Sequence, residues 1–88
     1  MLKLSSKEHF FKSKLRLAAN NLPKLYSLYK IAPTDKTKGL ALAVIALSTD
    51  DKTDALEILK NARRLMIDEY DGLILCGIYE ELILHEND

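Results

Sequence analysis

Residue types that build catalytic and metal sites are scarce in this 88-residue chain, which has one cysteine, two histidines, three glycines and no tryptophan. The single cysteine, Cys76, excludes an internal disulfide, and its apolar neighbours favour a packing role in a reducing compartment. His9 and His85 lie near opposite ends of the chain and have no partner at ligand spacing. No phosphate-binding loop or nucleophile motif occurs among the glycines. The sequence therefore predicts a protein that is not an enzyme and that has no catalytic residue, metal site or cofactor.

Two clusters of acidic residues, at positions 50–54 and 68–71, have the composition of a cation site but not its spacing. A calcium loop needs a glycine at its bend, and the first cluster contains none. Acidic residues at the start of a helix are favoured by the helix dipole. Both clusters are therefore interpreted as helix starts.

Long apolar runs are also missing. The longest, at residues 40–47, has eight residues, far fewer than the roughly 20 needed to cross a bilayer. Lysines interrupt the amino-terminal segment repeatedly, so no export signal is visible. Apolar residues make up 48% of the chain and charged residues 30%, which is typical of a folded globular protein. We expect residues 1–88 to form a single soluble domain in the cytoplasm, without a transmembrane segment.

The net charge is zero, but the charges are divided unequally along the chain. Residues 1–40 hold nine Lys or Arg and two acids, whereas residues 41–88 hold four and eleven, so the halves carry +7 and −7. This division indicates either a strong dipole that steers a charged partner or two solvated faces that attract each other. The sequence leaves both interpretations open.

Apolar residues recur at helical spacing in five segments, which predicts an all-α fold of about five antiparallel helices. The expected helices span residues 6–20, 23–32, 35–48, 52–67 and 72–85. Local signals set the boundaries: Ser5 or Ser6 can cap the first helix, and Pro23 suits the first turn of the second. Thr34 or Asp35 can cap the third helix.

A small helical motif is repeated after 34 residues, the length of a tetratricopeptide repeat. The repeat pairs Gly39 with Leu73, Leu42 with Cys76 and Ala43 with Gly77. The residues expected to pack neighbouring helices together are Leu42, Ala43, Ala55, Leu59, Ala62, Cys76 and Gly77. This pattern predicts a short solenoid of helical hairpins, although an antiparallel bundle rich in Ala and Leu also shows such spacing by coincidence.

In size, helix number and repeat, the chain resembles the small tetratricopeptide-like chaperones of bacterial type III secretion systems, which keep the needle subunit from polymerising in the cytoplasm. The residues that carry the resemblance are Gly39, Leu42, Ala43, Ala55, Leu59, Ala62, Leu73, Cys76 and Gly77. The resemblance implies a protein-binding chaperone that works with a second small helical protein, a co-chaperone. It also implies that the two hold the apolar carboxy-terminal helix of the needle subunit in a concave groove.

The expected groove follows from the geometry of this repeat, in which the first helix of each hairpin lines the concave side. We expect the partner helix to contact Leu40, Val44 and Leu47 of the third helix and Ile74 and Ile78 of the fifth. The alternative is that these side chains close an ordinary bundle core.

Four amino-terminal aromatic residues have two interpretations, an internal packing layer or a docking surface for the co-chaperone; they are Phe10, Phe11, Tyr26 and Tyr29. The first helix is also basic, which gives the rival hypothesis of a small helical nucleic-acid-binding regulator. Its aromatic residues recur at helical spacing with leucines, which favours core packing over base stacking, so nucleic acid is the less favoured partner. A membrane-surface helix and a plain structural subunit of a larger assembly are the remaining alternatives.

Overall fold

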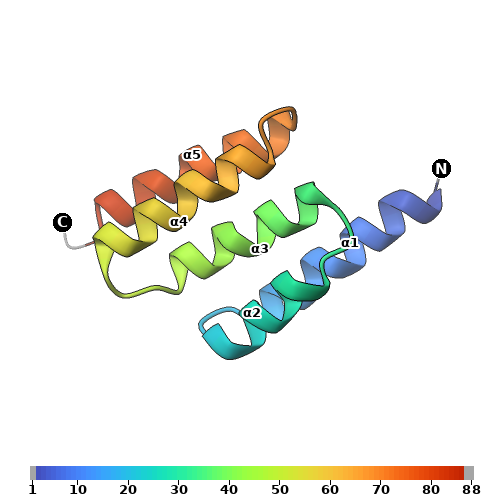
Figure 1. Cartoon of the computed structure of the whole chain (residues 1–88), viewed down its shortest axis with the longest axis horizontal. Coiled ribbons are helices and arrows are strands. Elements are labelled where there is room, and N and C mark those ends of the chain that lie inside the picture. Colours follow the sequence, from blue (N-terminus) through green and yellow to red (C-terminus); the bar gives the residue numbers. More distant parts are fainter. Residues whose placement is uncertain (1, 87–88) are drawn as a thin grey trace.

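Five α-helices make up the computed structural model of the chain, which describes the backbone of residues 2–86 and the side chains of residues 7–86. The helices are α1 (Leu2–Leu17), α2 (Leu22–Ile31), α3 (Asp35–Leu47), α4 (Lys52–Leu65) and α5 (Tyr70–Leu84) (Figure 1). No strand occurs in the described part of the chain. The prediction of an all-α fold with about five helices is therefore confirmed.

The turn between α1 and α2 depends on two adjacent asparagines. Asn20 has a positive φ of 69°, a left-handed conformation that asparagine tolerates better than most residues. Asn21 caps α2, because its Oδ1 accepts a hydrogen bond from the N–H of Lys24 at 3.3 Å. Pro23 lies in the first turn of α2, as predicted, where its missing N–H is not needed.

Two polar caps start the central helices. The hydroxyl of Thr34 accepts a hydrogen bond from the N–H of Thr37 at 3.1 Å, and the hydroxyl of Thr37 accepts one from the N–H of Thr34 at 3.0 Å. This reciprocal capping box shows that Thr34, and not Asp35, caps α3. Asp51 caps α4, since its Oδ1 accepts a hydrogen bond from the N–H of Asp54 at 3.0 Å.

Two helices begin two or more residues earlier than predicted. α1 begins at Leu2, so neither Ser5 nor Ser6 caps it; the residues before these serines are good helix formers, and the helix continues through both. α5 begins at Tyr70, two residues before the expected position. Gly72 lies inside its first turn and is buried there, so this glycine does not interrupt the helix.

α3 lies between the other helices, with α4 and α5 on one side and α1 and α2 on the other (Figure 1). Two contacts show that α1 and α3 are parallel: Lys36, in the first turn of α3, pairs with Glu8 in the middle of α1, and the N–H of Asn20 donates to Oγ of Ser48 at 3.1 Å just after both helices end. Lys36 also binds Asp71 at the start of α5. α1, α3 and α5 therefore run in one direction, and α2 and α4 run in the other (Figure 1).

Met66 packs between α3 and α5 at two positions where only glycine leaves room for it. The Met66 side chain is fully buried. A Cβ added at Gly39 would lie 2.5 Å from Met66 Cγ, and a Cβ added at Gly72 would lie 2.5 Å from Met66 Sδ. Because interiors are close-packed, neither position accepts a side chain without movement of its neighbours.

The residues expected to pack neighbouring helices together divide into three groups. Five of them are at most 1% exposed to solvent: Ala43, Ala55, Leu59, Ala62 and Cys76. Leu42 is half-buried against the same core. Gly77 was expected to allow close packing, and this expectation is wrong, since no heavy atom lies within 4 Å of the position that its Cβ would take. Cys76 and Gly72 are buried in the core instead, and Gly77 is only half-buried.

Candidate binding groove

An open groove with a volume of about 620 Å³ lies where α1, α3 and α5 meet. This volume is within the usual range for ligand-binding clefts, about 300–1,000 Å³. Its lining comes from α1 and the turn after it (Lys12, Leu15, Arg16, Ala19, Asn20), from α3 and its cap (Leu40, Val44, Leu47, Ser48) and from α5 (Asp71, Gly72, Leu75, Tyr79). The three parallel helices therefore form the groove.

The floor of the groove is apolar. Leu40, Val44 and Leu47 are separated by four and three residues, a spacing that places them on one face of α3. Leu40 is buried, whereas Val44 and Leu47 are half-buried and keep part of their apolar surface open. Leu15 of α1 and Leu75 of α5 extend this surface on either side.

Lys36 of α3 ties α1 and α5 together beside the groove. Its Nζ lies 3.1 Å from Oε2 of Glu8, 2.9 Å from Oδ2 of Asp71 and 3.8 Å from Oε1 of Glu69. Lys12, which lines the groove, lies 3.2 Å from the same oxygen of Glu8. One cation therefore bridges the three helices that form the groove, which helps to set its width.

The charges in this cluster reinforce one another. The hydrogen bond that Lys36 donates to Asp71 raises the pKa of Lys36, and the same bond lowers the pKa of Asp71. Burial acts to raise the pKa of Glu8, but the hydrogen bonds from Lys36 and Lys12 outweigh it, so the pKa of Glu8 is lowered. All three pKa shifts favour the charged forms at neutral pH.

Arg16 and Tyr79 lie towards the other end of the groove. Burial raises the pKa of the Tyr79 hydroxyl, while the positive charge of Arg16 acts in the opposite direction. Arg16 forms no salt bridge with any acid in the described part of the chain. A cation at the rim of an apolar groove is suited to pair with a carboxylate of a bound partner.

The structure divides the five residues that were expected to form the groove. Leu40, Val44 and Leu47 line it, as the repeat geometry predicted. Ile74 and Ile78 do not, because they lie on the outer side of α5 and are 46% and 51% exposed. The residues one position further along, Leu75 and Tyr79, line the groove instead.

The other ten of the thirteen lining residues were not predicted from the sequence, and four of them show why. Leu75 and Tyr79 have the same spacing as Ile74 and Ile78, and only the packing of Gly72 on Met66 selects the face of α5 that is turned inward. Leu15 and Arg16 join the groove because α1 is parallel to α3 and packs on it. The pattern of basic and apolar residues in α1 was the available signal, but it does not specify which helix α1 packs against.

The four amino-terminal aromatic residues do not form one surface. Phe11 is buried in the core, and Tyr29 is half-buried with Nζ of Lys38 lying 5.4 Å from its ring centroid. Phe10 is 64% exposed and Tyr26 is 43% exposed. The packing-layer interpretation therefore holds for Phe11 and Tyr29, and only the other two are available for docking.

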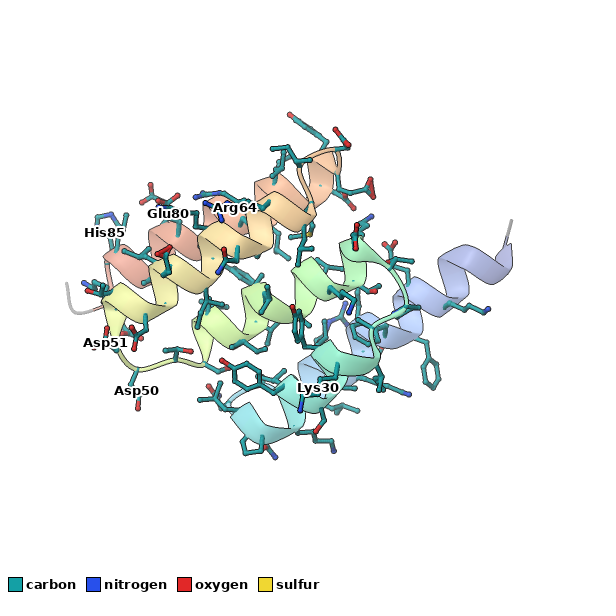
Figure 2. The ribbon with its side chains drawn as sticks, viewed as in Figure 1. Lys30, Asp50, Asp51, Arg64, Glu80 and His85 are labelled. Carbon is teal, nitrogen blue, oxygen red and sulfur yellow. The ribbon has the colours of Figure 1, made fainter. Side chains whose placement is uncertain are left out.

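Outside the groove, the residues whose side chains could bind a metal or react have structural roles. No group of three or more His, Cys, Asp or Glu in the described residues is placed to hold a metal ion. In the first acidic cluster, Asp50 points away from the helices and Asp51 lies at the start of α4 (Figure 2). Cys76 is fully buried, and burial raises the pKa of its thiol, which keeps the thiol protonated and unreactive.

Comparisons with known proteins give no relative for the chain. No protein-family model, no curated protein and no solved structure matches it at a significant level. Within residues 2–86, none of the helices has both the length and the apolar character that a bilayer span requires. The groove itself is therefore the feature of the chain that indicates a function.

Proposed function

We propose that the chain is a non-enzymatic chaperone or adaptor that holds an amphipathic helix of another protein in the groove between α1, α3 and α5. The observation that carries this proposal is the apolar floor formed by Leu40, Val44 and Leu47, which is part of an open groove rather than a closed core. An amphipathic helix binds such a surface through apolar side chains at a spacing of three and four residues.

The direction of the helices supports this proposal. In a tetratricopeptide array the first helices of successive hairpins are parallel and line the concave side. α1, α3 and α5 are parallel and the groove lies between them, which supports the proposal.

The resemblance noted in the sequence gives the proposal its particular partners. These are the needle subunit of a type III secretion system, bound through its apolar carboxy-terminal helix, and a small helical co-chaperone. A cytoplasmic location is part of the same proposal. The unpaired charge of Arg16 adds one requirement, an acidic residue on the bound helix opposite this end of the groove.

The rival hypothesis of nucleic-acid binding has less support from the side chains of α1. Lys12 is paired with Glu8, and Phe11 is buried in the core. Lys14 lies over the ring of Phe10, with Nζ 5.0 Å from the centroid. Phosphate binding needs cations that are free to contact the backbone, and base stacking needs exposed rings.

The first experiment is purification of the tagged full-length chain from its native cells together with its partners, followed by mass spectrometry. A Val44→Asp variant is purified in parallel, because a carboxylate in the groove floor is incompatible with an apolar ligand. Ile31→Lys is the matched control, since Ile31 lies outside the groove and is exposed. We expect Val44→Asp to lose a partner that both the wild type and Ile31→Lys retain. Equal recovery with all three proteins would show that the groove does not bind the partner.

A further inference from the structure

The outer side of α5 carries an apolar stripe that nothing in the described chain covers. Tyr70, Ile74, Ile78 and Leu82 are separated by four residues each, so they form one continuous line along the helix. Their exposed fractions are 79%, 46%, 51% and 56%. This outer stripe of α5 is separate from the groove, which uses the side of α5 that carries Leu75 and Tyr79.

The segment that carries the outer stripe of α5 is acidic. Residues 67–86 hold six acids and no lysine or arginine; the acids are Asp68, Glu69, Asp71, Glu80, Glu81 and Glu86. Lys36 and Arg63 from other helices pair with some of them, and Nζ of Lys52 donates to the carbonyl oxygen of Leu84, so three charges are offset. The segment keeps a net negative charge after this pairing, so a partner for the stripe should be both apolar and basic.

α1 has an exposed apolar stripe with basic residues around it, which complements the apolar and acidic stripe of α5. Phe10 and Leu17 are seven residues apart on one face of α1 and are 64% and 85% exposed. Lys14 lies on the same face between them, with Nζ above the Phe10 ring. Residues 7–31 hold six Lys or Arg and one acid, so this outer stripe of α1 lies on a basic surface.

We propose that the outer stripe of α5 of one copy of the chain docks on the outer stripe of α1 of a second copy. Apolar side chains meet at the centre of this interface, and acidic and basic residues pair around it. α1 and α5 lie on opposite sides of the central helix α3, and both stripes are exposed in the single chain (Figure 1). The contact is therefore head-to-tail between molecules, and a bound pair leaves one α1 stripe and one α5 stripe open.

A symmetric dimer, in which each stripe packs against the same stripe of a second copy, is not favoured by these surfaces. Two α5 stripes packed together would bring two acidic surfaces into contact, and two α1 stripes would bring two basic surfaces into contact. Like charges across an interface cost binding free energy. The +7 and −7 halves of the chain therefore favour the unlike pair.

The test uses sedimentation velocity on the full chain and on two double variants. Phe10→Glu/Leu17→Glu blocks the α1 stripe, and Ile74→Lys/Ile78→Lys blocks the α5 stripe. We expect the weight-average mass of the wild type to rise above the 10.0 kDa of one chain as the concentration increases. We expect it to fall between about 50 mM and about 500 mM NaCl, because salt shortens the range of the charge attraction.

The two variants together distinguish head-to-tail docking from any symmetric contact. Each variant alone should be a monomer, with an apparent Kd at least roughly tenfold weaker than that of the wild type, a change of about 1.4 kcal/mol. An equimolar mixture should form a one-to-one dimer, because each variant keeps the stripe that the other has lost. Circular dichroism confirms that both remain helical, and the single variants Leu17→Glu and Ile78→Lys replace any double variant that does not fold.

Three results would overturn this inference: a wild type that is monomeric up to about 1 mM, a variant that still associates alone, and a mixture that does not form a dimer. In the first case the stripes serve another protein or none. Val44→Asp should associate like the wild type, so the test is independent of the proposed groove.

Discussion

At the residue scale, the groove depends on a single cation that bridges three helices. Lys36 binds Glu8 of α1, Asp71 of α5 and Glu69 just before α5, and no other basic residue in the described chain contacts acids from two elements. Ion pairs at surfaces contribute little one by one, but a network with a half-buried centre contributes more. Asp71 is 62% exposed, so solvent screening keeps the effect modest.

We expect Lys36→Met to lower the free energy of unfolding by about 1 kcal/mol at neutral pH. The pKa values of Glu8 and Asp71 are lowered in the folded chain, so their contribution is present above their ordinary values and is lost as the pH falls through the lowered ones. The pKa of Lys36 is raised, so its contribution is present below its ordinary value and is lost as the pH rises through the raised one. The full difference between wild type and variant should therefore hold from about pH 5 to about pH 10.

Urea unfolding at several pH values measures this difference. It should shrink below about pH 4, where the carboxylates become protonated in both proteins. Lys30→Met is the matched control, because Lys30 lies exposed on α2 and forms no salt bridge in the described chain (Figure 2). A loss of equal size in the control, or a loss that persists unchanged at pH 3, would show that the Lys36 network does not stabilise the fold.

Two glycines on different helices give opposite predictions for the same substitution. Gly39→Ala gains about 1 kcal/mol of helix propensity, but its methyl group would approach Met66 Cγ to 2.5 Å and the carbonyl oxygen of Ala62 to 3.1 Å. Overpacking of this kind costs about 1–3 kcal/mol, so the net effect should be destabilising. Gly77→Ala meets nothing within 4 Å and should stabilise by up to about 1 kcal/mol. Urea unfolding of both variants checks the opposite signs, and a stabilised Gly39→Ala would contradict the packing of Met66.

At the element scale, the central helix α3 depends on its cap. α3 contacts all four other helices, so a frayed start would disturb both sides of the molecule. Thr34→Ala removes the oxygen that accepts from the N–H of Thr37, and we expect the free energy of unfolding to fall by about 1 kcal/mol. Thr34→Ser keeps the oxygen and should be close to the wild type in the same urea titration. If both variants lose the same amount, the cap is not the cause.

The sequence predicted the helices well where a boundary depends on neighbouring residues. Pro23, Thr34 and Asp51 act within one turn of their own helix, so their signals are complete in the local sequence. Ser5 and Ser6 were misread because a serine near the start of a helix is a cap only if the preceding residues are not helical, and here they are.

The face of α5 that turns towards the groove was also predicted wrongly, and here the cause is not local. Ile74, Leu75, Cys76 and Ile78 are all apolar, so the pattern of α5 does not mark one inner face. The contact between Gly72 and Met66, which comes from the end of α4, decides which residues turn inward. The sequence therefore predicted the α3 side of the groove and missed the α5 side.

At the scale of the whole molecule, the chain presents three separate surfaces for association. The groove has an apolar floor and lies between α1, α3 and α5. The two outer stripes lie on α1 and α5 and have opposite charge around them. A chain in which so much apolar surface stays open is expected to act through binding, and each surface can be blocked without the others.

The most direct test of the helix-binding groove is a fluorescence-anisotropy titration with a labelled peptide. The peptide is the carboxy-terminal helix of the proposed partner, a type III secretion needle subunit, and the proteins are the wild type, Val44→Asp and the control Ile31→Lys. We predict saturable binding to the wild type and to Ile31→Lys, and at least roughly tenfold weaker binding to Val44→Asp, a loss of about 1.4 kcal/mol or more. No binding to the wild type, or equal binding to Val44→Asp that is folded by circular dichroism, would contradict the proposal that this groove holds the partner helix.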